Sequence, residues 1–599
     1  MSGFVGILNL DGTPVNRVLL EQMTRFLSFR GPARQEWWSE GCIGFGHALL
    51  PTTRESAGEQ QPCSRDAAVW ITGDVRLDGR GALTEQLRAR GRSVGETAPD
   101  VELVLHAYAV WGRECVQHLM GDFAFAIWDG RRRELFCVRD PFGVAPFYYV
   151  QVNRTFLFSN TLDCIRLAPE VSDELNELAI ADWLLFRSNQ DASTTTFRAI
   201  RRLPPAYALT VAEGVIRCRR YWALPEPIEI QYRSPQEIIA QFQDLFYQAV
   251  EDRLRAERMV VPMSGGLDSS SVAVTAQRRL GDQRDVLRAY TLTVDELVTD
   301  EEGYYAGLVA AHAELPIQYV QYTVADGVEF ENSPRVAPEP GGLPRGAGKE
   351  ISQDGDASHV ILSGIGGDPL LYPSRTFLFE LVKGRQVGNL MRVVGQHVGM
   401  YGALPPLYVR SSLKRRANGM RLPLPRWLNP AFAARLDLAT RWRQVNERIE
   451  TQDPRRSMAE SPFWSNFFGR CDPGFTFKPI KLWFPFFDVR LVSFALTVPP
   501  VPWFVNKTLL REAMRGALPE AVRRRPKTPL RGDPTYQHAQ VNPFAWMKEL
   551  AMTPGLEPYV DRQVLLEIVN APAQSTRYEF ASARTPLALG YWLRRRDGL

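Results

Sequence analysis

A seven-residue loop at 264–270 constrains the fold more than any other stretch of the chain. It reads Ser-Gly-Gly-Leu-Asp-Ser-Ser, and it stands between an apolar run at 259–263 and a helical pattern from about Ser270. A strand that turns through two glycines into a helix is typical of a parallel α/β unit. Further apolar runs at 289–294 and 359–362 predict additional strands. We therefore predict a doubly wound parallel sheet with many helices over residues 236–599.

The loop residues suit a bound phosphate. Gly265 and Gly266 let backbone N–H groups turn inward as an anion-binding nest, and the following helix directs its N-terminus to the same point. Asp268 would repel a phosphate unless a cation intervened, so it indicates Mg²⁺ bridging to pyrophosphate. No Gly-Lys-Ser/Thr follows, so this is not a Walker loop. The hydroxyl donors are Ser264, Ser269 and Ser270. The alternative is an ordinary capped turn.

A second glycine loop, Ser-Gly-Ile-Gly-Gly-Asp at 363–368, follows the third strand. Because ligands of an open parallel sheet collect at the carboxyl ends of its strands, Asp368 and Asp268 are expected to share one Mg²⁺. Lys507, early in a later helical pattern, would hold negative charge that develops nearby. Taken alone, Asp368 would be a turn residue and Lys507 a surface residue.

The first 222 residues have a different character. Short apolar runs end in turns, and Asp129-Gly130 joins a hairpin between 123–128 and 134–138. A second hairpin is predicted between 147–150 and 155–158, with helices at 16–29 and 101–113. We predict a domain of antiparallel sheets with a few helices over 1–222. A proline-containing linker follows at 223–235.

Composition limits the possible functions. Lys and Arg number 71 against 67 Asp and Glu, which gives no basis for a nucleic-acid binder. The basic runs at 523–525 and 594–596 are interpreted as solvated faces, and 523–525 also as a possible docking surface. Seven cysteines without a Cys-x-x-Cys pair argue against a disulfide framework or zinc knuckle and fit a reducing cytoplasm. No signal peptide or membrane-spanning run is evident.

Together these segments resemble the asparagine synthetase (glutamine-hydrolysing) family over nearly the whole chain. Stretches 29–32, 121–126 and 139–149 resemble its glutaminase half, and 483–492 with the Lys507 helix resembles its synthetase half. The resemblance implies an N-terminal-nucleophile (Ntn)-type α+β sandwich joined to an α/β ATP-pyrophosphatase domain, similar to the adenine nucleotide α-hydrolases. It also implies that ATP is cleaved between its α and β phosphates.

The resemblance assigns roles residue by residue. Lys507 would contact the adenylate and stabilise the tetrahedral oxyanion, and Asp268 and Asp368 would bind Mg²⁺. The expected nucleotide contacts are Met263, Ser264, Gly265, Gly266, Asp268, Ser269, Ser270, Leu292, Ser363 and Gly364. No general base is singled out, since Glu339, Glu380 and His397 are all conceivable.

Three departures from the family bear on the substrate. The nucleophilic cysteine of the glutaminase is Ser2 here, and a serine hydroxyl is a poor nucleophile without a base. The glutamine-holding Asn-Gly-Glu-Ile-Tyr-Asn stretch reads Thr-Gly-Asp-Val-Arg-Leu at 72–77. Ile365 replaces the glutamate that serves the incoming ammonia. We therefore predict a scaffold domain without glutaminase activity.

Within the family, the chain resembles the lasso-peptide macrolactam cyclases most. That resemblance implies adenylation of an Asp or Glu side chain of a precursor core peptide, attack by its N-terminal amine, and release of AMP and pyrophosphate. The implied partners are the precursor peptide, a leader peptidase and a leader-recognition protein. The alternatives are β-lactam synthetase-like closure of a small amino acid, or a non-catalytic scaffold.

Overall fold

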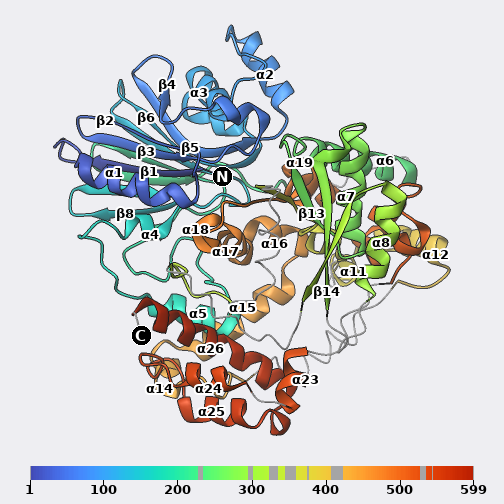
Figure 1. The fold of residues 1–599 in the computed structure, drawn as a ribbon. Helices are drawn as coiled ribbons and strands as arrows, with labels where there is room; N and C mark the ends of the chain where they lie inside the picture. Colours follow the sequence, from blue (N-terminus) through green and yellow to red (C-terminus); the bar gives the residue numbers. More distant parts are fainter. Residues whose placement is uncertain are drawn as a thin grey trace.

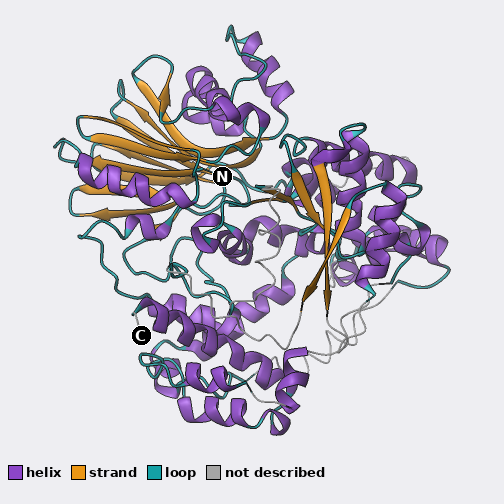
Figure 2. Cartoon of the chain, in the orientation of Figure 1, coloured by secondary structure: helices purple, strands orange, loops and turns teal. Residues whose placement is uncertain are grey.

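The computed structural model describes residues 2–226, 234–294, 301–322, 335–343, 359–373, 377–405, 423–526, 534–541 and 544–597. A two-sheet sandwich (blue to cyan), a parallel sheet flanked by helices (mainly green) and a helical region (orange to red) make up the molecule (Figure 1). Figure 2 shows that strands dominate the first region and helices the last.

The N-terminal region is a sandwich of two six-stranded antiparallel sheets. The first sheet has the order β10 (Arg201–Arg202), β8 (Tyr148–Val152), β9 (Thr155–Ser159), β1 (Gly3–Asn9), β3 (Ile43–Leu49), β2 (Arg34–Glu40). The second has the order β12 (Val215–Arg220), β11 (Tyr207–Ala212), β7 (Glu134–Arg139), β6 (Gly121–Asp129), β5 (Val69–Leu77), β4 (Cys63–Ser64). Alternate side chains of both sheets, such as Phe4, Phe45 and Leu135, fill the core between them.

Both predicted hairpins are confirmed. β6 and β7 pair from Asp129 with Glu134, and β8 and β9 pair from Val152 with Thr155. The predicted helices are also present, each shifted by a residue or more at its ends. The main helices here are α1 (Arg17–Phe26), α2 (Arg80–Ala89), α3 (Asp100–Trp111) and α5 (Glu177–Phe186).

The second region contains a five-stranded parallel sheet, which confirms the predicted fold class. Its order is β15 (Ile317–Tyr322), β14 (Leu287–Val294), β13 (Met259–Pro262), β16 (Val360–Leu362), β17 (Lys481–Trp483). The strand order reverses between β13 and β16, and such a switch point is where open α/β sheets bind ligands. Its main helices are α6 (Pro235–Glu251), α7 (Leu267–Leu280), α8 (Glu302–Ala313) and α19 (Val489–Thr497).

The C-terminal helices share a hydrophobic core with the first region. Trp427, Leu587 and Trp592 pack in one cluster with Ile180 and Leu184 of α5. The two parts of the chain on either side of residues 223–235 are therefore not independent folding units. The helices are α14 (Pro430–Arg435), α15 (Leu438–Thr451), α24 (Ala545–Ala551), α25 (Arg562–Asn570) and α26 (Arg577–Arg596). Among the helices described, none is both long and apolar enough to cross a membrane.

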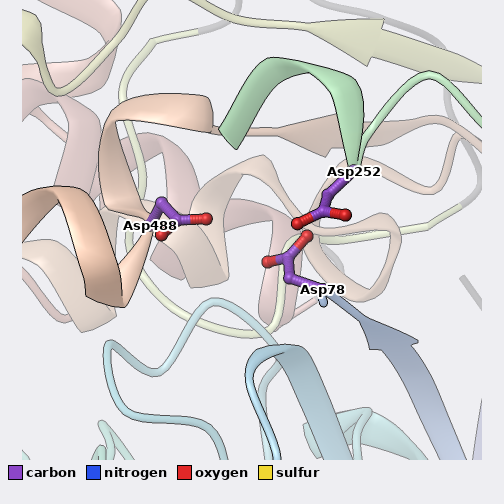
Figure 3. A group of neighbouring side chains, drawn as sticks. All are labelled: Asp78, Asp252 and Asp488. Atoms are coloured by element: carbon purple, nitrogen blue, oxygen red, sulfur yellow. The ribbon is translucent and has the colours of Figure 1, made fainter. Parts of the chain in front are cut away.

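Three buried or partly buried aspartates meet where the sandwich contacts the parallel-sheet region (Figure 3). Asp78 follows β5, Asp252 follows α6, and Asp488 caps α19. Their carboxylate oxygens lie within 4.8 Å of one another, a spacing that would also suit a metal ion.

Arginines neutralise this aspartate group. Arg253 reaches both Asp78, at 3.2 Å, and Asp488, at 3.5 Å, while Arg490 pairs with Asp488 at 2.7 Å and with Asp252 at 2.6 Å. Burial alone would raise the pKa of Asp78, but the charges of Arg253 and Arg76 hold it well below its usual range. The group is therefore an ion-pair network that joins the two regions.

Candidate active site

Two glycine loops meet at the carboxyl ends of the adjacent strands β13 and β16. A Cβ on Gly364 would lie 2.7 Å from the Cα of Ser269, and a Cβ on Gly367 would lie 2.5 Å from the Cγ of Asp268. Gly366 has a φ of +107°, a conformation that L side chains rarely adopt. Glycine is thus required for the second loop to approach the first this closely.

The first loop opens the N-terminus of α7 toward an anion. The N-cap is Gly266, and within the described structure no side chain caps the helix. The N–H groups of the first turn, which no described side chain caps, and the helix dipole therefore favour a bound phosphate. The Ser269 hydroxyl accepts a hydrogen bond from Ser264 N at 3.2 Å. The Ser270 hydroxyl is buried and has no hydrogen-bond partner among the described residues. This is expected of a hydroxyl that donates to a bound ligand.

Lys507 joins the two loops. Its Nζ lies 2.5 Å from Oδ2 of Asp268 and 2.6 Å from Oδ1 of Asp368. The Lys507 side chain is 16% exposed, while Asp268 is 18% and Asp368 52% exposed. The two predicted metal ligands thus converge on one point, although they come from loops 100 residues apart in sequence.

The residues present fit Mg²⁺. Carboxylate oxygens are the ligands that this hard cation prefers. Asp268, Asp368 and Lys507 together carry a net charge of −1, so a divalent cation would leave the group positive. A positive centre beside an open helix N-terminus suits pyrophosphate, whose charge neither Lys507 nor the helix could balance alone.

A strained turn presents Lys507. Asn506 and Lys507 have φ values of +50° and +56°, both in the left-handed region that disfavours side-chain-bearing residues. Tyr401 of α12 (Val387–Tyr401) donates a hydrogen bond to Val505 O at 3.0 Å and contacts Thr508 Oγ1. Arg511 donates to Asn506 O at 2.7 Å. These bonds on both sides hold the turn in its strained form.

Tyr401→Phe should therefore lower kcat about tenfold while the KM for ATP stays nearly unchanged. The variant loses the hydroxyl that fixes the Lys507 turn, and misplacing a transition-state contact by about 1.4 kcal/mol costs a factor of ten in rate. Steady-state kinetics would measure this, with the exposed Tyr304→Phe as control. A raised KM with unchanged kcat would instead place Tyr401 in ground-state binding.

Arg525 was not predicted as a site residue, yet it contacts the first loop. Its Nη1 donates to Gly265 O at 3.4 Å, and its guanidinium lies 4.0 Å from the centre of the Tyr305 ring. The interpretation of run 523–525 as a solvated face is wrong for Arg523 as well, which is buried against Glu512 and Glu520. The sequence alone does not distinguish these two arginines from exposed ones, because their contacts are to residues distant in the chain or depend on the fold.

The predicted nucleoside contacts lie at or near the carboxyl ends of strands β13, β14 and β16. Met263 N donates to Tyr290 O at 2.7 Å, and Ser363 N donates to Trp483 O at 2.8 Å. Both N–H groups are thus occupied by the sheet, and the Met263 carbonyl oxygen accepts a hydrogen bond from Thr291 Oγ1 at 2.7 Å. Among the described residues, this leaves the Ser363 carbonyl oxygen and Gly364 for a ligand. The Leu292 side chain is 43% exposed on β14.

Two of the candidate bases can be placed. Glu339 accepts hydrogen bonds from Thr196 N at 2.9 Å and from Arg202 at 2.6 Å, so it is held away from a base role. His397 is buried in α12, where its ring stacks on Tyr401 at 4.5 Å and burial lowers its pKa. The side chain of Glu380 lies outside the described residues.

The structure also describes the surroundings of Ser2 and of Gly73 and Asp74 in the N-terminal region. The Ser2 hydroxyl accepts a hydrogen bond from Leu50 N at 3.3 Å, and Asp74 lies 3.7 Å from Lys481 of the other region. Gly73 N donates to Gln61 at 2.8 Å. Burial lowers the pKa of His47 to about 3, so this imidazole is neutral.

The two folds and the paired loops define a class of protein. In it, an antiparallel sandwich of the amidotransferase type precedes a parallel sheet with loops suited to a nucleotide. Residues 1–222 match the glutamine amidotransferase domain, and residues 241–594 match asparagine synthase. The chain belongs to the asparagine synthase family.

Several curated proteins are similar in sequence to parts of this chain. Asparagine synthetase [glutamine-hydrolyzing] 3 of Bacillus subtilis is 32% identical over 281 residues, covering 46% of this chain and 45% of that protein. A putative asparagine synthetase of Methanocaldococcus jannaschii is 27% identical over 423 residues, covering 66% and 80%. Amidase chry2 of Gibberella zeae is 28% identical over 308 residues, covering 48% and 45%. The chain spans about half the length of the first of these relatives.

Proposed function

We propose that the protein is an ATP-dependent, AMP-forming amide ligase that closes a macrolactam in a peptide, as a lasso-peptide cyclase does. The observation that carries the ligase proposal is the Lys507 ammonium held between Asp268 and Asp368, beside an open helix N-terminus at the switch point of the sheet. That group can hold a polyphosphate and a developing oxyanion at the same place.

Two bond exchanges make up the proposed reaction. A side-chain carboxylate oxygen of the peptide attacks the α phosphorus of ATP, the bond to the β-phosphate oxygen breaks, and pyrophosphate leaves. The peptide's N-terminal nitrogen then attacks the acyl carbon, the bond to AMP breaks, and the amine proton passes to solvent. Mg²⁺ bound by Asp268 and Asp368 would supply charge neutralisation for pyrophosphate.

The protein's own groups support each step. The α7 N-terminus and Arg525, beside Gly265, would hold the phosphates. The Lys507 ammonium would stabilise the oxyanion when the amine attacks. An amine with a pKa of about 7.7–8.0 is partly neutral at physiological pH and needs no strong base, which fits the engaged state of Glu339.

Ile365, an exposed residue of the second glycine loop, supports a peptide as the substrate. Ile365 is 39% exposed, on the loop that carries Asp368, and it cannot take a proton from ammonia. An apolar exposed side chain there suits a larger organic substrate. In this proposal the precursor peptide is the substrate, and a leader peptidase and leader-recognition protein deliver it.

We also propose that the N-terminal region hydrolyses no glutamine. The Gly73 N–H is committed to Gln61, and Lys481 stands beside Asp74. A glutamine ligand would have to displace both. The region then acts as the scaffold to which the catalytic region is bound by ion pairs and a shared core.

Ser2→Cys should therefore release no more glutamate from glutamine than the unmodified protein does. The substitution restores the thiol but leaves Gly73, Lys481 and the neutral His47 as they are. A coupled glutamate assay would measure this, with N-terminal Met removal verified by mass and the exposed Ser93→Cys as thiol control. Sustained glutamate release would show that the pocket is a functional glutaminase lacking only its nucleophile.

The proposed function is tested by incubating the purified chain with MgATP and a leader-free core peptide. Formation of AMP and pyrophosphate, together with loss of one water from the peptide mass, is the expected result. AMP formation only with a small amino acid would favour β-lactam-type ring closure. ADP formation, or no nucleotide cleavage with any carboxylate, would overturn adenylation and leave the scaffold alternative.

A further inference from the structure

A polar cavity lies between the sandwich and the C-terminal half, away from the two glycine loops. Its walls come from β8, α5, the segment 338–340 and α17 (Pro462–Cys471). A volume of about 40 Å³ is open to the centres of water molecules, room for roughly three of them. Exposed Arg187 is among the lining residues, so one end of the cavity lies near the molecular surface. The polar wall includes Tyr148, Trp183, Arg202, Glu339, Asn466 and Arg470.

Both carboxylates of the wall are already paired. Glu339 binds Arg202 at 2.6 Å, and this arginine also donates to Asn466 at 3.1 Å. Asp472 is held by the fully buried Arg30, whose Nη2 lies 3.1 Å from Oδ2. Each acid therefore already has an arginine partner of its own.

Arg470 is a cation of the wall without such a carboxylate partner among the described residues. Within the described part of the chain, no carboxylate lies within 4.0 Å of its guanidinium. Its Nη1 donates to Arg187 O at 3.0 Å, and the guanidinium lies 5.6 Å from the centre of the Trp183 ring. Burial lowers the pKa of Arg470 although the charge of Glu339 opposes this shift, as expected for a partly buried cation without a close ion-pair partner.

A second group of the wall lacks a partner. The indole Nε1 of Trp183 is buried and finds no acceptor among the residues that the structure describes. A buried N–H without an acceptor costs about 1–3 kcal/mol, so such a group commonly marks a bound water or ligand. Trp183 and Arg470 both line the cavity, and an oxygen anion in it could accept from the indole Nε1 and from the remaining N–H groups of the guanidinium.

We propose that this cavity binds a carboxylate group, with Arg470 and the Trp183 indole as its donors. A guanidinium matches the planar geometry of a carboxylate in a bidentate pair. The small size favours a carboxylate over a phosphate, and Glu339 and Asp472 in the wall would repel a dianion more strongly than a monoanion. The carboxylate belongs either to a small free acid or to the C-terminus of a peptide. The site stands independently of the proposed adenylation chemistry.

Thermal unfolding of the full chain in sodium acetate, with sodium chloride at equal ionic strength as reference, tests the proposal without ATP. Acetate should raise Tm by a few degrees in a saturable manner, since a ligand that binds the native state stabilises it. Acetamide, which is neutral and of the same shape, should have no effect. Arg470→Met should weaken the apparent acetate affinity at least tenfold, whereas the exposed Arg443→Met should leave it unchanged.

Trp183→Phe supplies a second variant, which keeps a six-membered aromatic ring but removes the pyrrole part of the indole together with its N–H; it should weaken acetate binding severalfold. A tripeptide acid compared with its C-terminal amide distinguishes the two sources: stabilisation by the acid alone identifies peptide C-termini, and stabilisation by acetate but by neither peptide identifies small acids. Equal acetate effects in the original chain and Arg470→Met, or equal effects of acetate and acetamide, would overturn the site.

Discussion

Lys507→Ala should abolish amide formation, with a fall in kcat of at least about 100-fold. Loss of one preorganised charge at a developing oxyanion typically costs a factor of 100 to 1,000. Here the loss is aggravated, because the ammonium also stands between Asp268 and Asp368 at 2.5 and 2.6 Å. Without it the two carboxylates face each other unbalanced, which disfavours an incoming polyphosphate.

The assay would follow AMP release and the peptide mass under single-turnover conditions. Lys548→Ala, an exposed lysine on α24, serves as the matched control and should retain full rate. Lys507→Arg keeps the charge but not the geometry of a point ammonium, so it should recover only part of the activity. Retention of more than a tenth of the rate in Lys507→Ala would contradict the role assigned to this residue.

The local elements of this fold could be predicted because their signals lie within short stretches. The hairpins carry Asp-Gly turns or short loops between apolar runs, and α6 begins where Ser234 caps it and Pro235 follows. Strand β13 and its glycine loop are likewise contiguous in sequence. The predicted parallel sheet followed from that unit, and the resemblance to a family supplied the partner loop and Lys507.

Residues whose roles depend on distant segments could not be predicted in this way. β17 has three residues and forms only because β16, more than 100 residues earlier, offers it an edge. In the sequence, Arg525 belongs to a basic run that is typical of an exposed surface, although it donates to Gly265 O. Nothing in the sequence indicates that Lys481 lies beside Asp74. Charge patterns along a chain do not distinguish a solvated arginine from one that binds a loop or bridges two regions.

Arg253→Met should lower the free energy of unfolding by about 3 kcal/mol, because it removes one partner of a buried ion-pair network. The Arg253 side chain is 1% exposed and reaches Asp78 in the sandwich and Asp488 on α19. Methionine fills much of the same volume, so the cost comes from carboxylates left with less counter-charge rather than from a cavity. Urea titration followed by tryptophan fluorescence would measure the midpoint of the first transition, since a chain of this size need not unfold in two states.

A surface pair separates this effect from the loss of any arginine. Arg131 pairs with Asp66, and their side chains are 63% and 41% exposed, so Arg131→Met should cost less than about 1 kcal/mol. Adding Asp78→Asn to Arg253→Met removes a carboxylate that has lost part of its counter-charge and should recover part of the stability, which a double-mutant cycle would measure. If Arg253→Met cost no more than Arg131→Met, the network would not bind the sandwich to the parallel-sheet region. The scaffold role proposed for the sandwich would then rest on the shared hydrophobic core alone.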